Sequence, residues 1–532
     1  MRLVPACRTA ATLAVLGVAG SAPARAQTAP AVLDTTAWFV GGIDPVAAES
    51  AFVPEVPTLD SLGAETTSPD VVEVPVDTTS APDSAARPPR YIARAIQQTL
   101  VSNVVVNRAN AWLFGADWAR RVNFETWSRN LRLGWEWDED GFEINMFGHP
   151  YQGGMYFNAG RANGLSYVES IPLALLGSWT WEYFGEDLRP SLNDLFVTTL
   201  GGIAFGEMAH RVAVNVRDER AGGLERIGRE SLALVVDPVG GLNRLARGQW
   251  TRRGPNPAER DPSQFYYRVE AGVRREWADP DDGSERTASP TLALDGGFGD
   301  PFERAYREPF DVFSLHGEFS AGGIEAVQTT GRLYQAGLPD LTGLKELGFG
   351  ARHAFVVSQR FDYLNTPAYR YGGPSLEAGV LSRITLPLGI ALRTRVAASA
   401  LVMGAINPPD ARPADDPADR NRDHDFGPGF GGLVNVSVTL RDMPILLLRS
   451  RGEYLHSVSG TPADHRLIFG DLKAMLPVRG GLGAGVYLSA DTRSSQYGRE
   501  PGLATSFFQT RLFVSWTNER RSRTAPAPSL TP

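Results

Sequence analysis

The chain has 532 residues, a formal net charge of −8 and a single cysteine, Cys7. This length is sufficient for two or more domains. The negative charge and the lack of a run of Lys and Arg argue against a nucleic-acid partner, because phosphate binding needs clustered cations. With its one thiol so near the start, the rest of the chain contains no disulfide, no thiolate catalyst and no cysteine metal ligand.

Residues 1–26 have the pattern of a secretory signal peptide. Arg2 and Arg8 precede the short apolar run AATLAVLGVAG, and ARA supplies the small residues of a cleavage site. Residues 27–90 are rich in Pro, Ala, Ser, Thr and acids. They predict a disordered acidic linker, because the prolines interrupt helices and sheets and little apolar surface is available to bury.

Residues 91–218 have the rhythm of helices. In YIARAIQQTLVSNVVVNRANAWLFG, Ile96, Leu100 and Val104 recur near a helical period. Ser166 and Glu169 form a capping box at the start of a second predicted helix, and RPSLNDLFVTTLGGIAFGEMAHRVAVNV is the third. None of these runs holds about twenty apolar residues without a charge, so none predicts a transmembrane helix. We expect a small helical bundle, followed by a connector over residues 219–263.

From about residue 264 the hydrophobic period changes to two. Val434, Val436 and Val438 fall on one side of GGLVNVSVTL, and Asn435 and Ser437 fall on the other. Long strands with one apolar and one polar face are typical of transmembrane β-barrels, whereas the strands of a soluble sandwich are usually shorter. About twelve strands are predicted, near residues 264–276, 288–298, 309–321, 325–336, 345–361, 375–387, 389–405, 427–441, 444–457, 464–476, 480–493 and 504–517.

The connections between these strands alternate in length. LPLG, RDMP and VRGG are tight turns, whereas NPPDARPADDPADRNRDHDFGPG and SSQYGREPG are long loops. Outer-membrane barrels have short periplasmic turns and long external loops, and an even strand number puts both chain ends on the short-turn side. The barrel is therefore expected over residues 264–518, followed by a flexible tail over 519–532. The segment FFQTRLFVSW is the expected signal for the barrel-assembly machinery.

Charged residues of the polar strand faces are expected to line the lumen of the barrel. Two interpretations are open: the charges pair with one another across the lumen, or they form a selective pore. We favour pairing, because paired charges need no ligand. The residues are Arg393, Arg395, Arg449, Arg451, Glu453, Asp471, Lys473 and Arg511.

The motifs NMFGHPYQGGMYFNAGRANG, GSWTWEYFGE and PSLNDLFVTTLGGIAFGE, in this order, resemble a domain-of-unknown-function family, DUF3943. The resemblance covers about residues 110–218. It implies a bacterial outer-membrane protein in which helices with polar motifs accompany a barrel. It implies no established activity.

The candidates for a catalytic or binding site lie in the same helical region: His149, Arg161, Glu182, Glu186 and Glu207. In a hydrolase, His149 would be the base and Glu182 would orient its ring, with Ser170 or Ser178 as nucleophile. No G-x-S-x-G motif is present. A serine inside a helix more often donates to a carbonyl of the preceding turn, and a His before a Pro suits a helix start.

Glu207 and His210 are the candidates for a metal site. Their E-x-x-H spacing occurs in dimetal carboxylate bundles, but those need two such pairs and two further Glu, and the sequence has one pair. Arg211 lies four residues after Glu207, which favours an ordinary helical ion pair. We therefore expect no cofactor and no metal.

The fold expected is a mixed one: a small α-helical domain, then a C-terminal antiparallel transmembrane β-barrel in the bacterial outer membrane. The helices are expected at the periplasmic side or in the barrel mouth. The function expected is a pore or an envelope structural component with the helices as plug or periplasmic domain. The alternative is an envelope hydrolase that acts on lipid or cell-wall substrates. The expected partners are outer-membrane lipid and the barrel-assembly machinery, and a small-molecule ligand is left open.

Overall fold

The structure is a computed structural model that describes residues 89–518, apart from 138–139, 258–259, 279–286, 304–305, 341, 347, 367–368, 408–422, 442, 479 and 499–501. The predicted signal peptide, the predicted linker up to residue 88 and the predicted tail after residue 518 lie outside the described residues.

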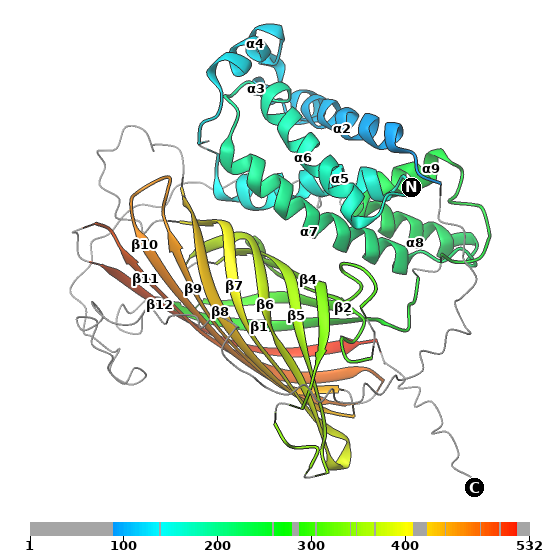
Figure 1. Ribbon diagram of the computed structural model, residues 1–532, viewed down its shortest axis with the longest axis vertical. Coiled ribbons are helices and arrows are strands. Elements are labelled where there is room, and N and C mark those ends of the chain that lie inside the picture. Colours follow the sequence, from blue (N-terminus) through cyan, green and yellow to red (C-terminus); the bar gives the residue numbers. More distant parts are fainter. Residues whose placement is uncertain are drawn as a thin grey trace, which may run out of the picture. The chain divides into compact units, whose positions relative to one another are not determined.

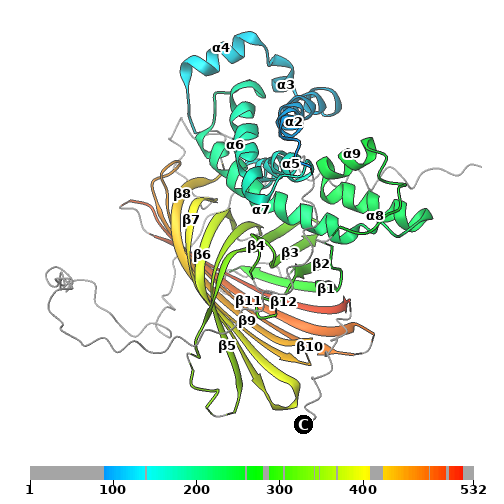
Figure 2. The ribbon, with the colours of Figure 1, turned by 45° about the vertical axis from the view of Figure 1, so that its right-hand side comes forward.

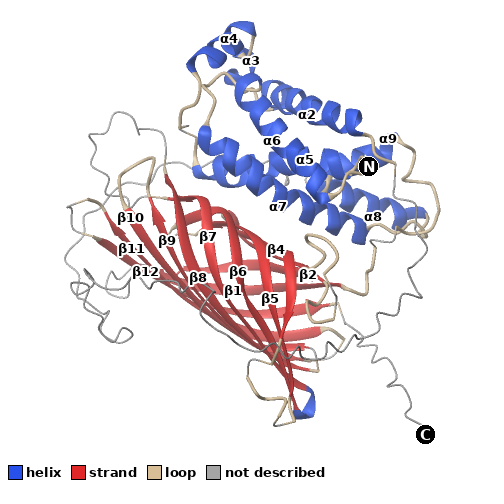
Figure 3. Ribbon diagram, viewed as in Figure 1, coloured by secondary structure: helices blue, strands red, loops and turns tan. Residues whose placement is uncertain are grey.

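The described part of the chain begins with helices and continues with strands (Figure 3). The predicted capping box is present at the start of α6, where Glu169 N–H donates to Ser166 Oγ and Ser166 N–H donates to Glu169 Oε2. The expected connector, residues 219–263, contains two helices, so the helical region extends beyond residue 218. No described helix is long and apolar enough to cross a membrane. The helices are α2 (Ile92–Leu113), α3 (Asp117–Arg121), α4 (Phe124–Leu133), the π-helix η3 (Ile144–Gly148), α5 (His149–Arg161), α6 (Tyr167–Phe184), α7 (Leu192–Val216), α8 (Gly223–Val236) and α9 (Pro238–Ala246).

Twelve antiparallel strands close into a barrel, in which β1 pairs with β12 (Figure 1). The predicted fold class is thereby confirmed, and each strand lies within a few residues of its expected position. The strands are β1 (Phe265–Ala278), β2 (Thr287–Phe298), β3 (Phe313–Ser320), β4 (Gly323–Leu338), β5 (Gly350–Asn365), β6 (Arg370–Leu386), β7 (Ile390–Ile406), β8 (Asp425–Leu440), β9 (Met443–His456), β10 (Asp464–Pro477), β11 (Leu482–Gln496) and β12 (Leu503–Thr517).

The two faces of the strands separate as their sequence alternation predicts. On β8, Asn435 and Ser437 line a cavity inside the barrel, while Val434 is 46% exposed on the outside. On β12, Leu512 and Val514 are likewise exposed on the outer wall. Successive side chains of a strand point to opposite faces, so a polar lumen and an apolar outer wall follow directly from a period of two. The result is a barrel of the outer-membrane type.

Three connections depart from strict alternation. β3 and β4 are joined by Ala321 and Gly322 alone, although the pattern calls for a long loop there. At the end of the barrel that holds the chain termini, residues 299–312 and 339–349 form longer connections. The first of these contacts the helices, because Arg211 of α7 donates to Pro309 O at 3.0 Å. This loop is therefore a docking element and not a simple turn.

The helical domain is built on a very close contact between α5 and α7 (Figure 2). A Cβ added at Gly153 would lie 1.9 Å from Thr198 O, and one added at Gly154 would lie 3.3 Å from Gly206 N. Thr198, Gly202 and Gly206 are spaced by four residues and so share one face of α7. Small residues on both helices let the two backbones approach.

The helices contact the outer wall of the barrel. Ser358 and Arg360 of β5 line the internal cavity, so Gln359 and Phe361 face outward. Gln359 Nε2 donates to Leu200 O of α7 at 2.8 Å and Gln359 Oε1 accepts from the Tyr167 hydroxyl of α6 at 3.0 Å. Aromatic rings from both parts share one core, in which Phe205 of α7 meets Phe361 at a centroid distance of 5.0 Å.

The same domain reaches both ends of the barrel. At the end with the chain termini, Asn215 near the end of α7 accepts from Asp261 N–H. At the other end, Phe142 N–H donates to Asp423 Oδ1 at 2.9 Å, just before β8. Among the described residues, the helices contact the outside of the wall, and none of them lines the cavity inside the barrel.

Candidate functional site

The inside of the barrel holds a cavity of about 1030 Å³, to which all twelve strands contribute. Side chains of strands and of strand connections line it, and no described helix contributes. Its lining includes Arg441, Val478 and Gly481 from turns at the end with the chain termini, so the cavity extends to that end.

The lining carries nearly balanced charge. Nine arginines line the cavity against eight carboxylates, so the wall has no strong excess of either sign. The arginines are Arg268, Arg274, Arg332, Arg360, Arg393, Arg395, Arg441, Arg449 and Arg451, and the carboxylates are Glu276, Asp295, Glu318, Glu325, Asp362, Glu377, Asp471 and Asp491.

A group of buried charges behind this lining is centred on Glu270 of β1. Lys473 of β10 donates to both Glu270 oxygens, at 2.9 and 3.1 Å, and Arg511 of β12 lies 3.4 Å from Oε2. Lys473 also lies 3.3 Å from Asp295 of β2. All three members of the central set, Glu270, Lys473 and Arg511, are almost fully buried. Buried charges of this kind are tolerated only when each has an opposite charge in contact.

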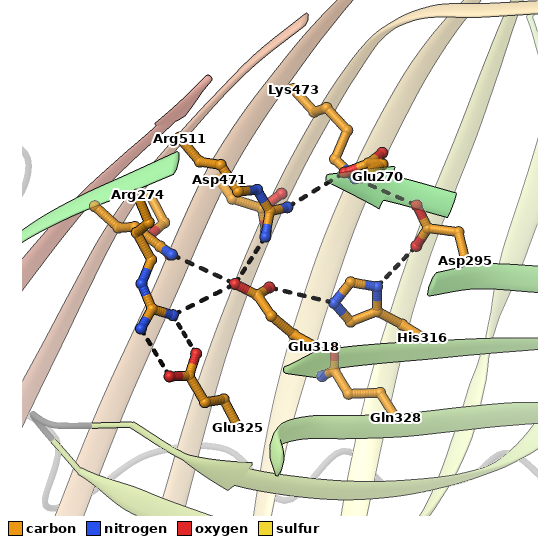
Figure 4. A network of polar contacts seen from close by, with 12 residues as sticks. Glu270, Arg274, Asp295, His316, Glu318, Glu325, Gln328, Asp471, Lys473 and Arg511 are labelled. Atoms are coloured by element: carbon orange, nitrogen blue, oxygen red, sulfur yellow. Dashed lines mark hydrogen bonds and ion pairs between the residues drawn. The ribbon is translucent and has the colours of Figure 1, made fainter. Parts of the chain in front are cut away.

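A second group surrounds Glu318 of β3 (Figure 4). Arg511 Nη1 lies 2.7 Å from Glu318 Oε1, and His316 Nε2 lies 3.7 Å from Oε2. The other ring nitrogen of His316 lies 2.7 Å from Asp295 Oδ1, so this histidine links the two groups. Arg274 extends the chain of contacts to Glu325, whose Oε1 accepts from Arg274 Nη2 at 2.7 Å.

A third group joins strands on another part of the wall. Arg360 of β5 contacts Asp362 at 2.8 Å and Glu377 of β6 at 2.7 Å, and also donates to Glu453 of β9. Arg451 donates to Asp362 at 2.9 Å. The lumen charges are thus largely paired with one another, as expected from the sequence.

An apolar layer crosses the lumen near the end away from the chain termini. Tyr369, which precedes β6, reaches across to β10 and β11: its ring lies 5.6 Å from Phe469, and its hydroxyl donates to Asp491 at 2.9 Å. Phe469 also lines the cavity. The layer therefore bounds the polar cavity on that side. Its buried members are Ala326, Leu364, Tyr369, Tyr371, Leu401, Ile406, Leu455 and Leu467.

The loop contact beside this end is electrostatic. Burial by itself raises the pKa of the Asp423 carboxyl, but a hydrogen bond and charge from His424, the charge of Arg370 and the Phe142 amide hold that pKa below its usual value. Asp423 is therefore an anion that ties the helical domain to the start of β8.

The polar candidates of the helical domain fall into two separate clusters. In the first, Glu207 lies between two cations: Arg161 Nε is 2.8 Å from Oε2, and Arg211 Nε is 2.7 Å from Oε1. Arg211 also contacts Glu308 of the β2–β3 loop at 2.9 Å. The Glu207–Arg211 ion pair expected from the spacing is present, and this cluster links α5 and α7 to the barrel. His210, the other metal candidate, is half-buried on α7.

The second cluster contains His149, Glu182 and Asp194, all buried. One donor atom from each lies within 4.8 Å of the other two, so this group has the composition and spacing of a metal site. Each acid also has a structural partner. Glu182 Oε2 accepts from Ser191 N–H at 2.8 Å, and Asp194 Oδ1 accepts from Asn193 Nδ2 at 3.0 Å. Glu182 thereby holds the start of α7 against α6.

The serines proposed as nucleophiles are engaged with carbonyls. Ser170 Oγ donates to Ser166 O at 2.8 Å, the bond to the preceding turn that was expected, and Ser178 Oγ donates to Asp194 O at 3.4 Å. Glu186 follows the end of α6 and is half-buried. Arg161, Glu182, Glu186 and Glu207 therefore do not meet in one site.

Sequence reasoning missed several lumen residues that the structure brings together, including Glu270, Asp295, His316 and Arg360. A signal for part of them is present in YYRVEAGVRREW, where Arg268, Glu270, Arg274 and Glu276 all fall on one face of β1. Their partners come from strands far along the chain, so the pairs themselves had no local signal.

Residues 134–239 match the family model described as a domain of unknown function, DUF3943. The resemblance expected from the motifs is confirmed, and the match extends through α8. No curated protein matches the sequence.

Solved structures of outer-membrane porins are similar to this chain. Pseudomonas aeruginosa OpdO has 11% sequence identity and a TM-score of 0.19, over 48% of this chain and 97% of that one. P. aeruginosa OccK1 (OpdK) has 10% identity and a TM-score of 0.17, over 48% and 98%. The KdgM porin has 9% identity and a TM-score of 0.15, over 47% and 99%. At these TM-scores the fold assignment rests on the strand pairing described above.

Proposed function

Because the chain carries a DUF3943 domain ahead of an outer-membrane-type β-barrel, we propose that it is an outer-membrane pore protein for small polar solutes. The observation that carries this proposal is the cavity of about 1030 Å³, with charged groups on its wall and an extension to the end with the chain termini. In bacterial barrels that end faces the periplasm.

The lining supports a pore with little preference for the sign of a solute. Nine arginines against eight carboxylates leave almost no net charge, and most of these groups are paired. In a gradient of KCl across a planar bilayer, we expect a reversal potential close to zero. A strongly selective reversal potential would contradict this part of the proposal.

The apolar layer around Tyr369 and Phe469 limits passage at the far end of the cavity. Hydrophobic constrictions restrict ions because water and ions leave an apolar passage. We expect Phe469→Ala to raise the single-channel conductance of the full-length protein severalfold. Ile468→Ala is the matched control, because Ile468 is the neighbouring residue of β10 and is 57% exposed on the outer wall.

The two variants decide between a pore and a closed barrel. Heat-modifiable migration first shows that the barrel is folded in each sample. If neither the folded wild type nor folded Phe469→Ala then conducts in bilayers, the chain is not a pore. If Ile468→Ala raises conductance as much as Phe469→Ala, the apolar layer is not the constriction. Because the helices contact the outer wall, the pore needs no movement of the helical domain to open.

Two partners belong to the same proposal. Outer-membrane lipid is expected against the apolar outer wall, where residues such as Leu512 and Val514 are exposed. The barrel-assembly machinery is expected to recognise β12, the last strand, whose FFQTRLFVSW segment ends at Trp516.

A further inference from the structure

The polarity of α2 is the reverse of that of a helix in a water-soluble bundle. Its apolar side chains Ile92, Leu100 and Val104 are exposed, Val104 to 61%. Its buried positions include Thr99, Asn103 and Asn107. The periodicity found in the sequence is correct, but the apolar face points away from the bundle. In water such an arrangement leaves a large apolar surface uncovered.

The buried polar groups of α2 are well satisfied. Asn103 Nδ2 donates to Gly177 O at 3.1 Å and to Thr180 Oγ1 at 2.9 Å, and Asn107 Nδ2 donates to Gly185 O at 2.8 Å. These bonds fix α2 to α6 through polar contacts. Hydrogen bonds between helices, with apolar side chains on the outside, are typical of helices that pack in lipid.

The same reversal recurs on the other outer helices. α8 buries the ion pair between Arg226 and Glu230, at 2.8 Å, and exposes Leu224 and Ile227. α9 likewise buries Asn243, whereas α6 buries Leu173 and Trp181 as well as polar groups but also exposes apolar side chains. The exposed apolar residues of these three helices are Val168, Leu175, Trp179, Leu224, Ile227, Leu232, Val235, Leu242 and Leu245.

The contacts of the helical domain with the barrel indicate what surrounds these exposed apolar side chains. The domain lies against the outward face of β5, and its contacts run from the β2–β3 loop to the start of β8, that is, from one end of the barrel to the other. Elsewhere the outer wall exposes an apolar belt, with Val396, Leu376 and Val434 about half exposed. A domain that follows this wall from end to end occupies the same layer as the belt.

Charge is absent from the central part of the α2 surface. From Ala95 to Asn107 the helix has no charged residue, and Arg94 and Arg108 stand at the two limits. At 1.5 Å per residue this stretch is roughly 20 Å long, about two thirds of the hydrocarbon thickness of a bilayer. Close glycine contacts between α5 and α7 agree with this environment, because helices in membranes commonly pack through small residues.

We propose that the outward faces of α2, α6, α8 and α9 contact lipid acyl chains and continue the apolar belt of the barrel. The helical domain is then embedded in the outer membrane beside the barrel, and is neither a plug nor a free periplasmic domain. The inference rests on the proposed membrane location of the barrel and goes beyond it, since it assigns a lipid surface to the DUF3943 domain.

Site-directed spin labelling tests this inference on the full chain. Cys7 is the only cysteine, so a Cys7→Ser background accepts single cysteines without interference. Val104→Cys and Ile227→Cys probe the helical surface in nanodiscs of outer-membrane phospholipid. Val514→Cys on the outer wall is the lipid reference, and Asp117→Cys, whose native side chain is 79% exposed, is the water reference.

Accessibility to oxygen and to a water-soluble nickel chelate separates the outcomes. We expect labels at 104 and 227 to match the label at 514, with at least tenfold less exposure to the chelate than the label at 117. Values at 104 and 227 like those at 117, with lipid values at 514, would overturn the lipid surface and leave the barrel's location intact. Water values at 514 as well would overturn the membrane location itself.

A second copy of the chain is the competing occupant of this surface. In nanodiscs that hold two copies, the labels at residue 104 would then show strong dipolar broadening and restricted motion. In nanodiscs that hold one copy, the same labels would become mobile again. That result would also overturn the proposal. Mobile lipid-type spectra at 104 in discs with a single copy support it.

Discussion

The contact between α5 and α7 provides the sharpest stability test of the helical domain. A Cβ added at Gly153 would lie 1.9 Å from Thr198 O and 3.0 Å from the Cα of Gly202. Both neighbours are backbone, so neither can rotate away, and the two helices must separate. Gly153→Ala is the smallest change that introduces this clash.

The expected loss combines two opposing effects. Overpacking of a closely packed contact costs about 3 kcal/mol. The gain in helix propensity of alanine over glycine offsets about 1 kcal/mol of this. The net loss is about 2 kcal/mol, which corresponds to a fall of roughly 4–8 °C in the melting temperature of a domain of this size.

Circular dichroism at 222 nm follows the melting of the helices, and heat-modifiable migration reports the barrel separately. Gly228→Ala is the matched control, because Gly228 lies inside α8 and a Cβ there would meet nothing within 4 Å. We expect this control to melt at or slightly above the wild-type temperature. A Gly153→Ala protein that melts with the wild type would refute the close approach of α5 and α7.

Substitutions at Arg360 and at Glu182 test the polar clusters. Arg360→Ala leaves Asp362, Glu377 and Glu453 without their shared cation inside the wall. We therefore expect the free energy of unfolding, measured with urea in lipid vesicles, to fall by about 3–5 kcal/mol. Arg466→Ala, on the outer side of β10, is the control and should have little effect. An Arg360→Ala barrel as stable as the wild type would show that Arg451 and Arg395, the other cations in contact with these acids, compensate for the loss. For Glu182, the Gln variant keeps an acceptor for Ser191 N–H, while the Ala variant leaves that donor unpaired at a cost of about 1–3 kcal/mol. Equal melting temperatures for Glu182→Gln and Glu182→Ala, both below the wild type, would instead indicate that the charge of Glu182 is needed, as in a metal site with His149 and Asp194.

Much of the barrel was predictable because strand alternation is a local property. Each strand shows its two faces within its own residues, as Val434 and Asn435 do on β8, and closure of twelve strands follows from the need to remove sheet edges in lipid. The Ser166–Glu169 capping box and the Glu207–Arg211 ion pair were predictable for the same reason, since their partners are three or four residues apart.

The sites inside the barrel depend on residues that are distant along the chain. Glu270 and Lys473 are 203 positions apart and meet only because β1 and β10 face the same lumen. Likewise, His149 meets Asp194 and Glu182 only after three helices have packed. No spacing rule covers such pairs, so the lumen could be predicted to be charged but its ion pairs could not be assigned.

By itself, then, the sequence determined the number of strands, their inward and outward faces and the positions of the main helices. Only the tertiary structure decided that the helices lie on the outer wall and that the apolar face of α2 points outward. The physical reason is that a periodic pattern defines a face but not its surroundings. The same row of Ile, Leu and Val side chains can face a protein core in water or face outward toward lipid, and its spacing is identical in both cases. Only contacts between distant parts of the chain, such as those of Gln359 and Phe361 with the helices, show which face of the barrel wall the helices meet.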